Sequence, residues 1–236
     1  MRERFSPPPL TLTLPIQIAD RLAQGIVEEH FMPGERLKEV DLAEGFSVSR
    51  ATIREALRIL EKRGLVMIYP QHGAQVTKLS RQQLEDMFDI RIVLLGLASR
   101  TVASRLTPDA ELRLQDGVVA LTAAREDANE YARASAQMSL LIADLSGNAL
   151  LSEHLKSFAQ HIGRYTRLGF TTSARREQSL RNWRRLLKAI LGADGEAAEA
   201  LHRMLSQENR MAALAEFDRR QLAPQPSPRR RPPLGD

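Results

Sequence analysis

Three arginines spaced four residues apart provide the strongest chemical signal in the chain. Arg50, Arg54 and Arg58 fall on one face of an expected helix, and aliphatic residues occupy another face. Guanidinium groups bind phosphates and guanine edges, and a helix fits the major groove of duplex DNA. Ser49 precedes the arginines as the expected N-cap, where its hydroxyl and the first helical amides can meet a phosphate. The competing interpretation is a solvated helix face.

The sequence predicts two helices before this arginine-bearing helix and a β-hairpin after it. Apolar residues at helical spacing predict a first helix near 18–26 and a short second helix near 42–46, followed by a turn at 45–48. The arginine-bearing third helix is expected to end at Gly64. A β-prone run, a turn and a return strand follow within 65–76, which indicates a hairpin.

The expected hairpin has His72 and Gly73 at its tip. Glycine there allows the backbone to approach a narrow groove or a phosphate closely. Helix, turn, helix and glycine-tipped hairpin therefore occur in winged-helix order, which favours DNA binding over a solvated face.

This segment resembles the winged helix-turn-helix of the GntR family of bacterial transcription regulators. The matching residues are Leu42, Ala43, Val48, Ser49, Arg50, Ala51, Thr52, Ile53, Arg54, Glu55, Ala56, Leu57, Leu60, Glu61, Gly64, Leu65, Val66, His72 and Gly73. The resemblance implies that DNA is contacted by Ser49, Arg50, Thr52, Arg54, Arg58, His72 and Gly73, with the last two in the minor groove.

One position departs from the family pattern. Many members carry an arginine on the second helix where this chain has Val40, so that contact is not carried over. Glu55 lies inside the motif, and we expect it to position Arg54 or Arg58 rather than to touch DNA.

Helical periodicity predicts about six helices between Ser80 and Phe217, with no sign of a sheet. The segment Asp89 to Leu94 and the run Ser146-Gly147-Asn148 resemble the FCD effector-binding domain of the FadR-type subfamily. The expected fold is therefore mainly α, with an N-terminal winged helix-turn-helix followed by an all-α, FCD-like bundle.

Many FCD domains hold a metal through an aspartate, a histidine four residues later, and two further histidines. The corresponding positions here fall on Ser135 and Ser139 and near Trp183 and Leu205, none of which suits a divalent transition metal. We therefore expect no metal and no cofactor. A displaced site would have to use His154, His161 or His202.

Without a metal, polar side chains in the helical domain would hold an effector directly. Arg91 is the leading candidate, because its guanidinium can bind a carboxylate bidentately. The alternative for Arg91 is an internal salt bridge. The expected effector-binding residues are Arg91, Ser135, Ser139, Asn148 and Trp183.

A basic cluster in the helical domain is interpreted as a solvated face and not as a binding site. It consists of Arg164, Arg167, Arg175 and Arg176.

Composition narrows the class of protein. The chain of 236 residues contains no cysteine, which excludes thiol catalysis and thiolate metal sites. A net charge of +5 favours a polyanionic partner, and aromatic residues at 5% provide no stacking cluster for RNA. We find no phosphate-binding loop, signal peptide or membrane span, and we expect a cytoplasmic protein that is not an enzyme.

Four segments are expected: a flexible arm at 1–14, the DNA-binding domain at 15–78, an effector-binding and dimerisation domain at 79–222, and a disordered basic tail at 223–236. The predicted protein is a homodimeric regulator, most simply a repressor, that binds a palindromic operator and responds to a small carboxylate. The alternative is a constitutive DNA-binding regulator that has lost ligand sensing.

Overall fold

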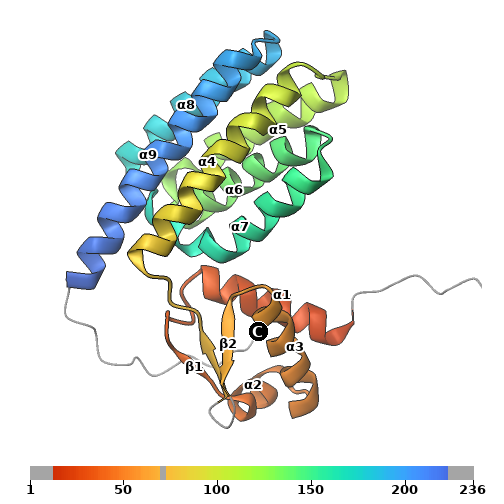
Figure 1. Ribbon diagram of the computed structural model, residues 1–236, viewed down its shortest axis with the longest axis vertical. Helices are drawn as coiled ribbons and strands as arrows, with labels where there is room; N and C mark the ends of the chain where they lie inside the picture. Colours follow the sequence, from red (N-terminus) through yellow and green to blue (C-terminus); the bar gives the residue numbers. More distant parts are fainter. Residues whose placement is uncertain (1–12, 70–72, 223–236) are drawn as a thin grey trace, which may run out of the picture. The chain divides into compact units, whose positions relative to one another are not determined.

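The computed structural model describes residues 13–69 and 73–222. Within them the chain divides into two compact units, with the division between Thr77 and Lys78. Figure 1 shows a small unit of helices and strands and a larger unit made of helices. The expected arm, apart from its last two residues, and the basic tail lie outside the described residues, as does His72. Leu14 already belongs to the first helix.

The N-terminal unit contains three helices, each with one buried face. They are α1 (Leu14–Val27), α2 (Glu39–Phe46) and α3 (Arg50–Lys62). A proline in the first turn suits the start of α1, where the backbone amides have no helical acceptor. The apolar sides of these helices join strand residues in one core, as the spacing of the aliphatic residues predicted.

A three-stranded antiparallel sheet completes this unit. Its strands are β1 (Arg36–Leu37), β2 (Val66–Tyr69) and β3 (Gly73–Val76), arranged in the order β1-β3-β2. The hairpin of β2 and β3 confirms the expected wing. β1 was not expected, because two residues carry no readable period and only pairing with β3 establishes the strand.

The turn between α2 and α3 is tighter than expected. Gly45 lies within α2, and the helix ends at Ser47, which adopts a left-handed conformation with φ of 54°. Such a residue stops a helix and redirects the chain. α3 therefore begins three residues later.

The C-terminal unit consists of six α-helices and one short 3₁₀ turn, in agreement with the helical period. They are α4 (Arg81–Ala103), α5 (Pro108–Ala123), η1 (Ala124–Glu126), α6 (Ala128–Leu145), α7 (Ala149–Leu168), α8 (Ser173–Leu191) and α9 (Gly195–Leu222). Side-chain caps begin several of them; the Thr107 hydroxyl, for example, accepts a hydrogen bond from Ala110 at the start of α5. No described helix is long and apolar enough to span a bilayer.

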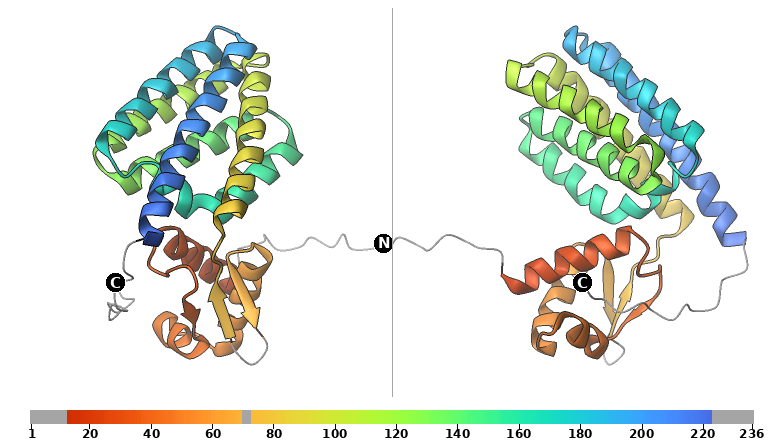
Figure 2. Two further views of the ribbon diagram at one scale, coloured as in Figure 1. Left: turned by 60° about the vertical axis from the view of Figure 1, so that its left-hand side comes forward. Right: turned by 180° about the vertical axis from the view of Figure 1, so that it is seen from behind.

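Helices α4 and α9 are antiparallel neighbours along much of their length (Figure 2). Arg81, at the start of α4, pairs with Asp218 near the end of α9 at 3.0 Å. Gly96 allows the helices to approach closely, since a Cβ atom at this position would lie 2.8 Å from the Arg203 side chain. The first and last helices of this unit are thus packed together.

The prediction that the arginines near residue 170 form a solvated face was wrong. Arg176 is buried and donates hydrogen bonds to four backbone carbonyls, those of Arg125, Glu126, Phe170 and Thr171, at 2.6 to 3.2 Å. These carbonyls belong to η1 and to the segment between α7 and α8. Arg176 therefore ties two connections together.

The other members of that cluster are also buried or held by tertiary contacts. Arg164 is buried, and Arg175 pairs with Glu208 of α9 at 3.0 Å. Arg167 donates to the Asn129 side chain at 2.6 Å. The sequence did not reveal the partners of Arg167 and Arg175, because both partners come from other helices.

Candidate nucleic-acid interface and ligand site

The arginines of α3 form an exposed row on the N-terminal unit. Arg50, Arg54 and Arg58 are exposed, whereas another face of the helix is buried in the core. The buried residues are Ile53, Ala56, Leu57 and Leu60. Because the apolar face fixes the rotation of the helix, the arginines present one continuous cationic row to an external polyanion.

Ser49 caps α3 as expected. Its hydroxyl accepts a hydrogen bond from the Thr52 amide at 3.1 Å and lies 2.8 Å from the Thr52 hydroxyl. These two predicted contact residues therefore lie together at the positive end of the helix dipole, beside Arg50. This arrangement suits a phosphate oxygen.

The partner of Arg54 is Glu39, at the first position of α2, and not Glu55. The Nε and Nη2 atoms of Arg54 donate to the two carboxylate oxygens of Glu39 at 3.2 and 3.0 Å. The Arg54 hydrogen bond lowers the pKa of Glu39, and the nearby charge of Arg50 contributes. The expectation that Glu55 positions Arg54 was therefore wrong, because the partner comes from another helix.

The wing carries the other predicted contact. Gly73 pairs with Tyr69 across the hairpin and has φ of +80°, a conformation that disfavours other residue types. His72 lies outside the described residues. Val40 is exposed on α2, and its side chain offers no hydrogen-bond donor.

In the helical unit, the positions that correspond to the metal ligands of many FCD domains carry side chains that do not fit a metal. Ser135 and Ser139 are buried on α6, and the Ser139 hydroxyl donates to the Ser135 carbonyl at 3.1 Å. Trp183 and Leu205 belong to the hydrophobic core. Serine, tryptophan and leucine are unsuitable ligands for a divalent transition metal.

The displaced histidine site is not formed either. Among the described residues, no three His, Cys, Asp or Glu side chains come together as a metal site would require. His154 is exposed on α7, and the Nδ1 atom of His161 lies 2.7 Å from the Ser157 carbonyl. His202 is fully buried on another helix, α9.

His202 is the centre of a polar cluster that the sequence did not reveal. Its Nδ1 atom lies 2.6 Å from the Ser99 hydroxyl, and its ring packs edge-on against Trp183 with centroids 5.3 Å apart. Burial, with a smaller effect from the charge of Arg91, lowers the pKa of His202 to about 3. The imidazole is therefore neutral at pH 7. Its position in the apolar period of α9, between Ala198 and Leu205, is the signal that indicates burial.

Arg91 lies near this cluster with no acidic partner. Burial of its guanidinium lowers the pKa of Arg91 to about 10, and no described residue forms an ion pair with it. The alternative interpretation, an internal salt bridge, was thus wrong. Among the buried polar atoms of the described residues that have no hydrogen-bond partner are His202 Nε2, Trp183 Nε1 and Ser206 Oγ.

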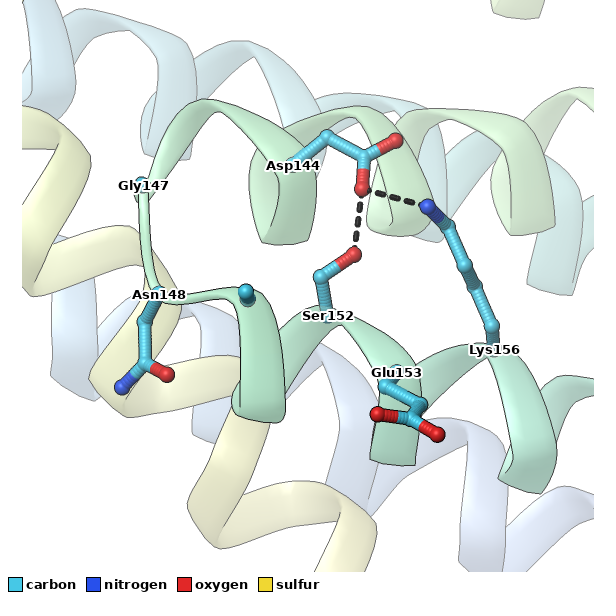
Figure 3. A pocket seen from close by; sticks show the side chains of 7 residues that line it. Asp144, Gly147, Asn148, Ser152, Glu153 and Lys156 are labelled. Atoms are coloured by element: carbon cyan, nitrogen blue, oxygen red, sulfur yellow. Dashed lines mark hydrogen bonds and ion pairs between the residues drawn. The ribbon is translucent and has the colours of Figure 1, made fainter. Parts of the chain in front are cut away.

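Asn148 lies elsewhere. Its exposed side chain caps α7 by accepting a hydrogen bond from the Leu151 amide at 3.1 Å. It lines a surface pocket in which Asp144 contacts Ser152 and Lys156, as Figure 3 shows. Asn148 therefore does not share a site with the buried Trp183, contrary to the sequence interpretation.

A short helix, a tight turn, an arginine-bearing helix and a β-hairpin define a winged helix-turn-helix DNA-binding protein. The chain belongs to the gntR family of bacterial regulatory proteins, whose model matches residues 16–76, and it carries an FCD domain that matches residues 86–207. It is a transcription regulator and not an enzyme.

Relatives and solved structures agree with this assignment. The uncharacterized HTH-type transcriptional regulator YdhC of Bacillus subtilis is 32% identical over 192 residues, 78% of this chain and 84% of that protein. The HTH-type transcriptional repressor RspR of Escherichia coli is 26% identical, over 78% of this chain and 81% of its own. The fold is also similar to E. coli McbR/YncC, with a TM-score of 0.78 and 22% identity over 88% of this chain and 100% of that one.

Proposed function

We propose that α3 reads an operator in the major groove and that the wing contacts the adjacent minor groove. The observation that carries this proposal is the exposed row of Arg50, Arg54 and Arg58 on a helix whose other face is buried. Ser49 and Thr52 add hydroxyls at the helix start, and Gly73 belongs to the wing. His72, the residue before Gly73 in the sequence, is proposed to contribute to the same contact. Arginines in such a row contact guanine edges and phosphates.

Alanine substitutions test this contact set. A duplex is first selected by the full-length protein from a randomised library, and its dissociation constant is then measured at one salt concentration. Arg50→Ala and Arg54→Ala should each weaken binding roughly tenfold or more. Arg21→Ala removes the same charge from an exposed position of α1 and should have a much smaller effect. Unchanged affinity in both α3 variants would refute the proposal.

The protein is proposed to act as a homodimer through the exposed face of α4. Ile90, Val93 and Leu97 are 52%, 49% and 44% exposed, and they lie on one side of this helix. An exposed apolar face of this kind marks a protein contact. A second copy of the chain fits it, because the charges flanking the face are self-complementary.

The complementarity follows from spacing along α4. Asp86 and Arg100 are exposed and lie seven residues on either side of Val93. If two α4 helices cross antiparallel with Val93 on the two-fold axis, Asp86 of each copy faces Arg100 of the other. The same patch then serves both subunits, as a two-fold interface requires.

A two-fold dimer presents its two α3 helices to inverted half-sites, so the operator should be palindromic. The protein is proposed to act in the cytoplasm, the compartment that holds the chromosome. The simplest outcome of operator binding is repression, because the bound protein occupies the promoter. A relative named as a repressor supports this direction of control.

The effector is proposed to be a small carboxylate held by Arg91 without a metal. An unpaired, partly buried guanidinium favours an anion, and the indole N–H of Trp183 offers a further donor near His202. Ser135 and Ser139 lie buried on α6 and are proposed to supply further polar contacts to the ligand. Binding would change DNA affinity only by favouring one spacing of the two DNA-binding units over another.

Thermal shifts with a panel of mono- and dicarboxylates test this site. A ligand at a concentration one hundred times its dissociation constant stabilises the folded state by about 2.7 kcal/mol. At least one carboxylate should raise the melting temperature of the wild type, and the shift should disappear in Arg91→Ala. Arg105→Ala, which removes an exposed guanidinium from the segment after α4, should retain the shift.

Constitutive DNA binding remains the second candidate, and one observation favours it. Trp183 and Leu205 fill two of the expected ligand positions with core side chains. If no carboxylate changes either the melting temperature or operator binding, this second function is the better description.

A further inference from the structure

Glu39 of α2 forms an ion pair with Arg54 of α3, which is one of the expected DNA-contact residues. Among the described residues, it is the one side-chain pair between these two helices that involves such a residue. Both carboxylate oxygens of Glu39 accept hydrogen bonds from the Nε and Nη2 atoms of Arg54. The Glu39 side chain is 29% exposed and that of Arg54 is 56% exposed. The pair is thus anchored on one side and open on the other.

We propose that Glu39 is a specificity-determining residue that holds the Arg54 guanidinium ready to read a guanine. A guanidinium has five N–H groups, and Glu39 accepts from only two of them. The edge formed by Nη1 and the second Nη2 hydrogen is left for another acceptor pair. Guanine presents O6 and N7 in the major groove at the matching spacing.

A held guanidinium discriminates between bases better than a mobile one. A free arginine on a helix can swing from a base edge to a phosphate, where it binds every sequence equally. Two hydrogen bonds to Glu39 fix the plane of the guanidinium before DNA arrives, which lowers the entropy lost on binding. This inference rests on the proposed contact of Arg54 with the operator.

Two other roles for Glu39 make different predictions. As a mere negative charge beside DNA, Glu39 would weaken binding to every duplex, so its removal would tighten binding. As the acidic first residue of α2, it would act only on the stability of that helix. Neither role alters the preference for one base over another.

The experiment compares two duplexes with full-length variants at one salt concentration. The first duplex is the one that the wild type selects from a randomised library. In the second, the G·C pair whose selection is lost in Arg54→Ala is replaced by A·T. Glu39→Asp keeps the charge but is one methylene shorter, and Glu39→Gln removes the charge. Glu44→Gln removes an equal charge from an exposed position of the same helix.

We expect Glu39→Asp and Glu39→Gln to reduce the preference for the first duplex roughly five- to tenfold, and Glu44→Gln to preserve it. In an Arg54→Ala background, neither Glu39 substitution should change the preference further. Melting temperatures of the Glu39→Asp and wild-type proteins should agree within a few degrees.

Three results would overturn the inference. The Glu39 variants could keep the wild-type preference, or the Glu39→Gln effect could persist after Arg54 is removed. Both results would leave the proposed contact of Arg54 with DNA intact. If instead Arg54→Ala binds and discriminates like the wild type, that contact fails, and the role of Glu39 fails with it.

Discussion

The Nδ1 atom of His202 lies 2.6 Å from the hydroxyl of Ser99, and this hydrogen bond joins the last helix of the C-terminal unit to the first. The pair is fully buried, with the ring of Trp183 against the imidazole. A neutral histidine satisfies one hydrogen bond here without the cost of burying a charge. His202 is therefore a structural element of the α4 and α9 contact.

This burial makes the protein sensitive to acid. The pKa of His202 is lowered to about 3, whereas an unfolded histidine titrates near 6.5. Below about pH 6.5 the unfolded state binds a proton that the folded state does not, so the free energy of unfolding falls by up to about 1.4 kcal/mol per pH unit until the pH nears 3. His202→Phe should remove this contribution in denaturant titrations between pH 7 and 4.5. His154→Gln, at an exposed position, should keep the wild-type slope, and parallel curves for wild type and His202→Phe would contradict the prediction.

Arg176 should be among the most important single side chains for the stability of the helical unit. Its removal leaves four backbone carbonyls without their donor, and we expect Arg176→Ala to lower the free energy of unfolding by about 2 to 4 kcal/mol. Arg133→Ala, which breaks an exposed pair with Glu130, should change it by less than about 0.5 kcal/mol. Denaturant midpoints measure both, and an equal loss would show that the carbonyl contacts are not the cause.

Substitutions of Ser49 should separate helix capping from DNA binding. Ser49→Ala removes the cap of α3 and should cost about 1 kcal/mol of stability together with operator affinity. Ser49→Asp keeps a capping oxygen but places a negative charge where a phosphate is expected, so stability should be retained while affinity falls. Melting curves and operator titrations of the two variants distinguish these effects. Operator affinity equal to wild type in Ser49→Asp would exclude a phosphate near this hydroxyl.

The exposed face of α4 predicts how the proposed dimer can be disrupted. Val93→Glu places a charge on the proposed two-fold axis and should convert the dimer to a monomer in sedimentation or light-scattering measurements. Val119→Glu alters another exposed valine, 67% exposed on α5, and should leave the mass unchanged. A dimeric Val93→Glu protein would place the interface elsewhere.

Much of the fold could be predicted because its signals are local. The arginine row, the Ser49 cap and the buried face of α3 all follow from residues within a few positions of one another. β1 could not be predicted, because two residues become a strand only through their pairing with Gln75 and Ala74.

In the candidate sites, too, local features could be predicted and contacts between distant segments could not. The exposure of Arg50 and Arg54 follows from helical period, but the carboxylate that holds Arg54 lies fifteen residues away on another helix. The burial of Arg176 could not be predicted, because its hydrogen-bond acceptors are backbone carbonyls of distant segments, which have no sequence signature. Contacts between segments that are distant in the sequence cannot be predicted from the periodicity of apolar and polar residues.

The antiparallel packing of α4 against α9 also affects synthesis on the ribosome. The pairs Arg81 with Asp218 and Ser99 with His202 form only after more than a hundred further residues have been made. The N-terminal unit has its whole core by residue 76, so it can fold while the helical unit is still incomplete. Nascent chains would therefore carry a folded DNA-binding unit well before the effector-binding unit closes around its last helix.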